Sequence, residues 1–285
     1  MPRPLPPIHP EPEYRVSGQR AQWYADMKQV FQVPWMGVVT MAFAHYPYFF
    51  EVLWQGLKPL AQSKPFVDAC TSLRSRTEAR VAALGPGPLV RRLETIGYAP
   101  REIDQIRASI EVFSHGNFPY LLTATAARRL LEGLDLGSSR SAPRYSGRHA
   151  PQVDAPFVLM EMHHADQDTR ALYEEIKATL GLPFVNTDYR ALARWPSYFA
   201  LAWRDLKPLV TSSEHAGICE AVHAYADELV GDLLPNPAAL TPDALQEAAR
   251  NDGSPDEILQ VTQLFQWLLP GLVTNVAFFR AQLVV

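Results

Sequence analysis

The sequence predicts an all-α fold made of two tandem homologous helical repeats that pack as a pseudo-two-fold dimer. Two observations lead to this fold class. Apolar side chains recur at helical spacing through most of the 285 residues, and no stretch alternates apolar and polar residues between turn signals as a strand would. In addition, many residues of the first half recur 149 positions later without a gap.

The repeat consists of identical side chains spread over half of the chain. The residues that recur 149 positions later are Tyr24, Lys28, Pro34, Ala44, Pro47, Phe50, Trp54, Leu57, Lys58, Pro59, Leu60 and Cys70. Their counterparts are Tyr173, Lys177, Pro183, Ala193, Pro196, Phe199, Trp203, Leu206, Lys207, Pro208, Leu209 and Cys219. Further along, the spacing becomes 155 residues, which pairs Pro100 with Pro255 and Gly116 with Gly271. Identity of this extent indicates a duplicated domain.

The first repeat is expected to span residues 17–134 and to follow an extended, proline-rich N-terminal segment over residues 1–16. Ser17 is expected to cap the first helix, and Pro34 and Pro47 suit the first turns of the next two. The expected helices are 17–31, one from Pro34, one from Pro47, 65–84, 89–96, one from Pro100 and, after a break at residues 116–120, a last one through Leu131.

Residues 135–165 are expected to link the repeats. Up to residue 157 this segment is rich in Ser, Arg, Gly and Pro and has no clear period. The second repeat, residues 166–285, is expected to form helices over residues 166–180, 184–194, 196–210, 214–233, 241–250, 255–269 and 270–283.

Composition excludes several classes of protein. The net charge is −4 and no block of like charge occurs, so the basic patch of a nucleic-acid-binding protein is missing. No apolar run reaches the length of a membrane span, and the N-terminus lacks the apolar core of a signal peptide. We expect a cytoplasmic protein without nucleic-acid or membrane partners. Cys70 and Cys219 form no disulfide framework and are expected to be small buried hydrophobic residues.

Two polar residues break the symmetry of the repeat. Asp188 stands where the first copy has Val39, and Asn117 stands where the second copy has Leu272. Each also has an ordinary structural interpretation, as a carboxylate at a helix start for Asp188 and as a helix cap for Asn117. In a pseudo-dimer, positions near the axis face their counterparts, so the two side chains could meet in one asymmetric pocket.

Other candidate chemistry is weak. The segment from Glu161 to Asp166 contains His163 and His164, but adjacent histidines point apart on a helix and the spacing matches no structural zinc site. We therefore expect no metal. Ser114 precedes a histidine, but no acid or oxyanion element that would complete a serine nucleophile is evident.

The segment NTDYRALA at residues 186–193, followed by Trp195–Tyr198 and Leu206–Pro208, resembles the group I 2-haloacid dehalogenases. These are cofactor-free enzymes that accept the D enantiomer or both enantiomers of their substrates. The resemblance extends over nearly the whole chain, including the duplication and the all-α form. It implies hydrolysis of short 2-haloalkanoic acids to 2-hydroxy acids, with a small halocarboxylic acid and water as partners, no cofactor, and a homodimer.

The resemblance also implies roles for single residues. Asp188 would be the general base that activates water for direct attack on Cα with inversion, and Asn117 would help to hold that water or the substrate. The positions that line the family's pocket correspond here to Trp35, Gly37, Val38, Tyr120 and Thr187. Val38 departs from the family's aromatic residue and Thr187 from its smaller hydroxyl, and both differences bear on the size of the accepted acid.

The chemistry agrees with these roles. Water is a poor nucleophile until a carboxylate takes its proton, and a carboxylate in the first turn of a helix is stabilised in its charged form. Asn186 and Thr187 are plausible N-cap residues for that helix, and helix N-termini offer backbone N–H groups to a substrate carboxylate. An asparagine such as Asn117 can accept one water proton and donate to another ligand.

Two other functions remain open at this stage. A non-catalytic small-acid-binding protein of the same fold would keep the pocket without the reaction, and halide release from 2-chloropropionate would distinguish the two. A helical peroxidase-like redox protein needs a reactive cysteine pair, whereas Cys70 and Cys219 lie singly in their halves.

Overall fold

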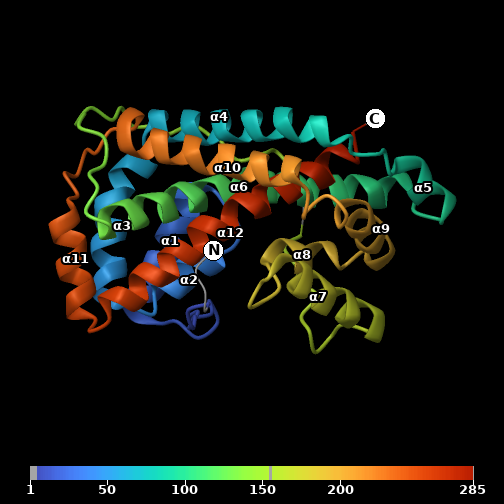
Figure 1. The fold of residues 1–285 in the computed structure, drawn as a ribbon, viewed down its shortest axis with the longest axis horizontal. Coiled ribbons are helices and arrows are strands. Elements are labelled where there is room, and N and C mark those ends of the chain that lie inside the picture. The colour runs from blue at the N-terminus through green and yellow to red at the C-terminus, as the bar shows by residue number, and fades with distance from the viewer. Residues whose placement is uncertain (1–4, 154–155, 285) are drawn as a thin grey trace. The chain divides into compact units, whose positions relative to one another are not determined.

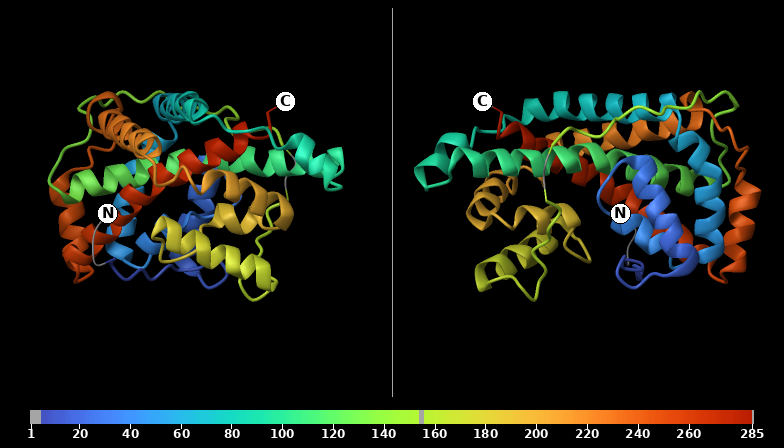
Figure 2. Two further views of the ribbon diagram at one scale, coloured as in Figure 1. Left: turned by 45° about the vertical axis from the view of Figure 1, so that its right-hand side comes forward. Right: turned by 180° about the vertical axis from the view of Figure 1, so that it is seen from behind.

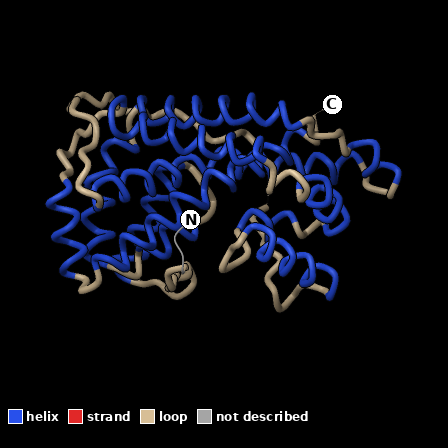
Figure 3. Tube along the Cα trace, viewed as in Figure 1, coloured by secondary structure: helices blue, strands red, loops and turns tan. Residues whose placement is uncertain are grey.

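The computed structural model describes residues 5–153 and 156–284. Residues 1–4 of the expected N-terminal segment, residues 154–155 of the expected linker and Val285 lie outside the described residues. Within the described ranges the chain is helical and forms no β-strand; the one β-bridge between Ser63 and Arg144 is isolated (Figure 3). The all-α class is therefore confirmed. None of the helices in these ranges is both long and apolar enough to span a membrane.

The elements follow the expected order along the chain (Figure 1). They are α1 (Gly18–Phe31), α2 (Val38–Phe43), α3 (Pro47–Ala61), α4 (Lys64–Val81), the 3₁₀ turn η1 (Ala82–Leu84), α5 (Val90–Thr95), α6 (Pro100–Leu131), α7 (Gln167–Leu180), α8 (Thr187–Leu192), α9 (Pro196–Leu206), α10 (Ser213–Glu228), the π-helical turn η2 (Leu229–Leu233), α11 (Pro242–Asn251) and α12 (Pro255–Ala281). Most bounds agree with the expected ones within a few residues.

Two expected helix breaks are wrong. Helix α6 continues through residues 116–120 with Pro119 inside it, and α12 unites the two helices expected on either side of Pro270. A proline inside a helix removes one backbone hydrogen bond and costs about 3 kcal/mol. Apolar side chains on both sides of Pro119, including Phe118 and Leu121, are buried, and their burial outweighs that local cost.

The chain forms two compact units, and neither is a single stretch of sequence. Unit 1 comprises Met1–Arg74, Gly116–Ala150 and Ala221–Gly271, and unit 2 comprises Ser75–His115, Pro151–Glu220 and Leu272–Val285. Each unit combines segments from both halves of the sequence. At the spacings of 149 and 155 residues, every segment of one unit corresponds to a segment of the other.

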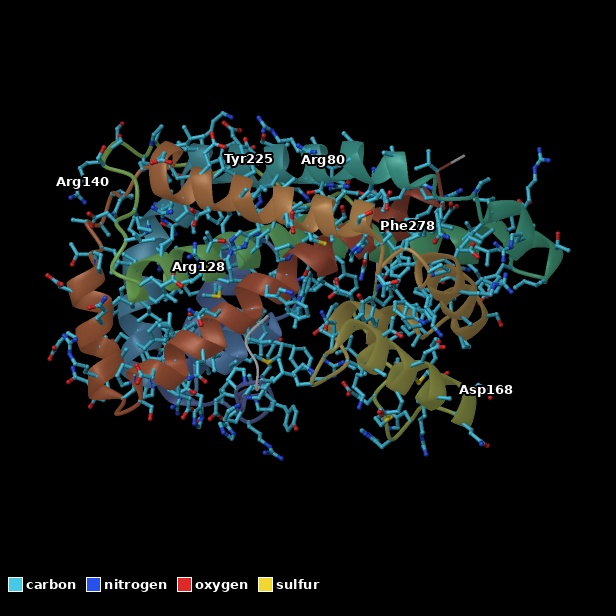
Figure 4. All side chains as sticks on the ribbon, viewed as in Figure 1. Arg80, Arg128, Arg140, Asp168, Tyr225 and Phe278 are labelled. Atoms are coloured by element: carbon cyan, nitrogen blue, oxygen red, sulfur yellow. The ribbon has the colours of Figure 1, made fainter. Side chains whose placement is uncertain are left out.

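In unit 1, α3 is the central helix and packs against α1, α2 and α11 (Figures 1 and 2). The aromatic ring of Phe31 lies between those of Trp54 and Tyr120, with ring centroids 5.7 and 5.4 Å away. Polar contacts in the same unit join α6 to α10, where Arg128 forms an ion pair with Asp227 (Arg128 is labelled in Figure 4). A core of aromatic rings thus carries the packing, with ion pairs outside it.

In unit 2, α8 packs against α9. The Tyr189 ring of α8 stacks on Phe199 of α9 at a centroid distance of 5.9 Å. Phe279 of α12 packs edge-on against both rings, at 6.4 and 6.2 Å, and its neighbour Phe278 is buried as well (Figure 4). Helix α8 is therefore held from one side by an aromatic cluster.

The same contacts occur in both units at corresponding positions. In unit 1 the indole N–H of Trp54 donates to the Asp26 carboxylate at 2.8 Å, and in unit 2 that of Trp203 donates to the Glu175 carboxylate at 3.0 Å. Both bounds of α1 and α7, and both bounds of α2 and α8, are 149 residues apart. Because these helices and contacts depend on the shared side chains, equal sequence spacing leads to equal local structure.

Candidate active site

Three of the residues predicted to line the pocket lie together in unit 1. The Tyr120 hydroxyl of α6 donates to the backbone carbonyl oxygen of Trp35 at 2.6 Å, and the two side-chain rings are 6.0 Å apart. A Cβ atom on Gly37 would lie 3.0 Å from three atoms of the Tyr120 ring, so glycine lets the loop before α2 approach that ring closely without displacing it. Val38 follows as the half-buried first residue of α2.

Trp35 also packs directly on the backbone of α6. A Cβ atom on Gly116 would lie 2.4 Å from Cη2 of the indole and 2.8 Å from Cγ1 of Val33. Asn117, the next residue, is 3% exposed and lies inside α6, so the helix-cap interpretation of this residue is wrong. Unit 1 thus brings Trp35 to the turn of α6 that carries Asn117.

The loop that carries Trp35 has an anchor that the sequence did not reveal. The backbone N–H of Met36 donates to the Glu13 carboxylate at 2.8 Å, and that carboxylate forms an ion pair with Lys28 of α1. Burial raises the pKa of the Tyr120 hydroxyl, which therefore keeps its proton and remains a donor to the Trp35 carbonyl. The loop is held by one charged and one neutral partner.

In unit 2, Thr187 and Asp188 are the first and second residues of α8, and both are buried. Asp188 is 2% exposed. Asn186 occupies the N-cap position, but its side chain makes no capping hydrogen bond, and its buried Oδ1 has no partner among the described residues. The expected N-cap position of Asn186 is therefore confirmed, but its side chain does not cap the helix. A buried carboxylate is costly unless its environment compensates, and such groups concentrate at functional sites.

An ion pair anchors the other end of this segment. Nη1 of Arg190 on α8 lies 2.7 and 2.8 Å from the two carboxylate oxygens of Glu161, and Nη2 lies 3.4 Å from the Thr187 hydroxyl oxygen. Hydrogen bonds between a guanidinium and a carboxylate are shorter and stronger than those between neutral groups. Glu161 therefore serves as a partner of Arg190, a role that the sequence did not suggest.

The two histidines after Glu161 lie in a turn, with His163 and His164 ring centroids 4.0 Å apart. The expectation that they point apart on a helix is wrong, because the helix begins only at Gln167. Across residues 5–153 and 156–284 no group of three or more His, Cys, Asp or Glu side chains is placed to hold a metal ion.

A chain of hydrogen bonds between buried side chains joins α8 to α10 and α12. Asn275 of α12 bridges the Tyr189 hydroxyl, at 2.9 Å, and Nε2 of His215 on α10, at 2.8 Å. Sequence reasoning missed these residues. The repeat held a signal for them, because Phe66 stands in the first copy at the position of His215.

The surroundings of the other candidate nucleophiles, Ser114, Cys70 and Cys219, do not activate these side chains. Ser114 donates to the Glu78 carboxylate at 3.2 Å. Burial raises the pKa of both the Cys70 and the Cys219 thiol, whereas reactive cysteines have a lowered pKa. Asp188 is therefore the candidate for the reacting group in the described chain.

Known proteins similar to this chain are 2-haloacid dehalogenases, although no protein-family model matches it. An (R)-2-haloacid dehalogenase of Rhizobium sp. (strain NHG3) is 49% identical over 240 residues, which cover 84% of this chain and 93% of the relative. An (R)-2-haloacid dehalogenase of Pseudomonas putida is 38% identical over 288 residues, covering 99% of this chain and 95% of the relative.

More distant similarity and a solved structure agree with these relatives. A configuration-inverting 2-haloacid dehalogenase of Pseudomonas sp. (strain 113) is 25% identical over 224 residues, covering 76% of this chain and 72% of the relative. The solved structure of a D-2-haloacid dehalogenase in complex with L-LA superposes with a TM-score of 0.90 at 36% identity. The match covers 100% of this chain and 99% of that one.

Proposed function

Because the chain belongs to the family of (R)-2-haloacid dehalogenases, we propose that it hydrolyses short (R)-2-haloalkanoic acids to (S)-2-hydroxy acids. The observation that carries this proposal is Asp188. It is a carboxylate only 2% exposed, at the second residue of α8, where the first copy of the repeat has Val39. A carboxyl group buried at such a position is typical of functional sites, and proton transfer is the role proposed for it.

In the proposed reaction, Asp188 accepts a proton from a water molecule while the water oxygen attacks the substrate Cα. The new C–O bond forms as the C–halogen bond breaks, the halide leaves with the bonding electron pair, and the second water proton stays on the new hydroxyl. Water, the acid and the side chains account for every atom, so the step balances without a further reactant. Attack opposite the leaving group inverts Cα.

Asn117 is proposed to hold the attacking water or the substrate, since its amide can accept one hydrogen bond and donate another. Trp35, Gly37, Val38, Tyr120 and Thr187 are proposed to line the pocket. The contact of Trp35 with Gly116, one residue before Asn117, supports this set within unit 1. The Thr187 hydroxyl, next to Asp188 in the sequence, is proposed to contact the substrate carboxylate.

Inversion and the preferred hand are supported by the relatives. A similar D-2-haloacid dehalogenase has been solved with L-LA, the hand of lactate that inversion of a D substrate produces, and another relative is configuration-inverting. For this chain we propose (R)-2-chloropropionate as a substrate and (S)-lactate as its product. Val38 and Thr187, which differ from the expected family residues, are proposed to set the accepted chain length.

The duplicated architecture is part of the proposal. We propose that the repeats at residues 17–134 and 166–285, joined by the linker at residues 135–165, are related by a pseudo-two-fold rotation. The matching bounds of α1 and α7 and the matching indole–carboxylate pairs support this relation. A crystal structure whose halves did not superpose by a near two-fold rotation would refute it. Light scattering would test the homodimer that the resemblance implies.

A single-turnover reaction in heavy-oxygen water, with enzyme in excess over (R)-2-chloropropionate, tests the mechanism. Direct attack by water puts the label in the hydroxyl of lactate during the first turnover. An Asp188 ester intermediate would instead give unlabelled lactate first and place the label in the Asp188 carboxylate. Halide release must be measured before this experiment. A protein that binds the acid but releases no halide would be the non-catalytic binding protein.

A further inference from the structure

In the chain of hydrogen bonds that ends on α8, each donor points toward α8. The Asn275 amide donates from Nδ2 to the Tyr189 hydroxyl oxygen at 2.9 Å, and its Oδ1 accepts from Nε2 of His215 at 2.8 Å. Burial lowers the pKa of His215 from its usual 6.5, so the ring is neutral at pH 7 and its Nδ1 is an acceptor. At the far end of these hydrogen bonds the Cys219 thiol lies 3.6 Å from Nδ1 and 3.8 Å from the Thr274 hydroxyl oxygen.

Such a chain is costly to keep in a protein interior. Tyr189, Asn275 and His215 are all at most 5% exposed, and each polar group would be left unpaired if one partner were lost. An unpaired buried donor or acceptor costs about 1–3 kcal/mol. Apolar side chains of similar size would avoid that risk, so packing alone does not account for the chain.

The corresponding part of unit 1 is built without it. Phe66, which has no polar side-chain group, takes the position of His215, and Tyr120 takes the position of Asn275 and donates instead to the Trp35 carbonyl. Both units build similar helices from the shared residues, so the fold does not require this chain. The hydrogen-bonded chain and the Asp188 carboxylate therefore both occur in unit 2, and neither has a counterpart at the corresponding positions of unit 1.

Helix α8 needs such support. It has only six residues and lacks a side-chain N-cap, and helices of this length do not hold their own geometry. Its orientation therefore depends on contacts with other elements. Tyr189 supplies one through its stacking on Phe199 and its bonded hydroxyl, and Arg190 supplies another through Glu161. Asp188 lies directly before these two anchored residues.

We propose that Tyr189, Asn275 and His215 are positioning residues of the reaction. They hold α8 so that the Asp188 carboxylate keeps the direction in which it takes the water proton. The proposal rests on the proposed function and adds residues that do not themselves touch the substrate. Displacing a catalytic group by about 1 Å can cost about 10²-fold in rate, which is why rigid support is needed.

The protein offers a matched control for this proposal elsewhere in the same two helices. The buried Gln266 of α12 and the half-buried His223 of α10 form a second amide–imidazole pair, at 3.1 Å, between the same two helices. This pair lies in unit 1, and its hydrogen bond does not continue to α8. Gln266→Leu and Asn275→Leu therefore remove the same kind of contact between the same helices, and only the second touches the support of α8.

The experiment measures kcat, KM and the midpoint of thermal unfolding for Tyr189→Phe, Asn275→Leu and Gln266→Leu with (R)-2-chloropropionate. We expect Tyr189→Phe and Asn275→Leu to lower kcat by about tenfold or more with KM changed by less than about twofold, because the base is misdirected while the binding groups remain. Gln266→Leu should lower the unfolding midpoint less than Asn275→Leu, because it removes one hydrogen bond instead of two, and should keep the kcat of the wild type.

The double variant Tyr189→Phe/Asn275→Leu completes the test. Residues that act through one contact are non-additive, so its kcat should equal that of the more impaired single variant. A wild-type kcat in folded Tyr189→Phe and Asn275→Leu would overturn the proposal, as would an equal loss in Gln266→Leu. An inactive wild type would refute the proposed function instead. Tyr189→Phe removes a single oxygen atom, so this variant still tests the proposal if Asn275→Leu does not fold.

Discussion

Gly116 of α6 and Gly271 of α12 occupy corresponding positions of the two copies, yet only Gly116 is crowded. A Cβ atom there would lie 2.4 Å from the Trp35 indole, whereas one on Gly271 would meet nothing within 4 Å. The two glycines therefore have different reasons to be glycine. Gly116 lets Trp35 approach the helix. Gly271 makes no such close contact, and its conformational freedom in the unfolded chain only destabilises the helix.

Gly116→Ala should displace the Trp35 indole. Because both the indole and the neighbouring Val33 are buried, we expect a loss of about 1–3 kcal/mol in the free energy of unfolding and a higher KM. Gly271→Ala is the matched control and should stabilise the protein by about 0.4–1 kcal/mol. Urea denaturation and halide-release kinetics measure both effects. Equal behaviour of the two variants would contradict the assigned packing of Trp35.

Asp188→Asn should lower kcat by about 10²- to 10⁴-fold and leave the fold intact, because an amide of the same shape cannot take the water proton. Circular dichroism and halide release measure the fold and the activity. A variant that kept most of its activity would rule out Asp188 as the base.

Asn117→Leu places the second-copy residue, Leu272, at the first-copy position. We expect a loss of about 10²-fold in kcat, since leucine has a similar volume but cannot hold a water molecule or the substrate by hydrogen bonds. Asn236→Leu is a control, because Asn236 is also buried and its side chain bonds to the backbone of its own loop at Leu240. Activity lost equally in both variants would point to a structural role for Asn117.

Glu13→Ala should loosen the loop that carries Trp35. The backbone N–H of Met36 would lose its 2.8 Å acceptor, at a cost of about 1–3 kcal/mol in unfolding free energy, and KM should rise. Lys28→Met removes the ion-pair partner of Glu13 but keeps that acceptor, so it should leave KM near the wild-type value. A KM unaffected by Glu13→Ala would show that the loop holds its position without this contact.

The helices could be predicted from the sequence because each pattern occurs twice. A helix indicated weakly in one copy, such as α2, gains support from its counterpart α8. Pro119 and Pro270 could not be placed correctly, since local propensity favours a break and only the burial of the flanking side chains decides against it. Tertiary packing determined the outcome at both prolines.

The candidate site was accessible to sequence reasoning in part. Asp188 could be found because it breaks the symmetry of the repeat. His215 and Asn275 are 60 residues apart, and nothing in either local pattern shows that their side chains meet. The Arg190–Glu161 pair depends in the same way on how the segment before α7 returns to α8. The fold decides which side chains distant in sequence form hydrogen bonds, and the local sequence pattern does not show these pairs.

The last prediction concerns pH and the indole–carboxylate pair of unit 2. The hydrogen bond from Lys207 and, to a smaller extent, that from the Trp203 indole lower the pKa of Glu175 from its usual 4.5. A carboxylate whose pKa is lower in the folded state stabilises the protein above the pKa of the unfolded state. This stabilisation is lost as the pH falls through the folded-state pKa.

Glu175→Gln keeps an acceptor for the Trp203 indole and removes only the charge. Because the Glu175 side chain is 43% exposed, solvent screening limits the expected loss at pH 7 to about 0.2–1 kcal/mol in unfolding free energy. The difference from the wild type should stay constant from about pH 6 to about pH 8, shrink below 4.5, and vanish in stronger acid. Tryptophan fluorescence during urea denaturation, repeated at each pH, measures it. Lys207→Met should show the same pH dependence, and a difference that persisted in strong acid would exclude the ion pair as its cause.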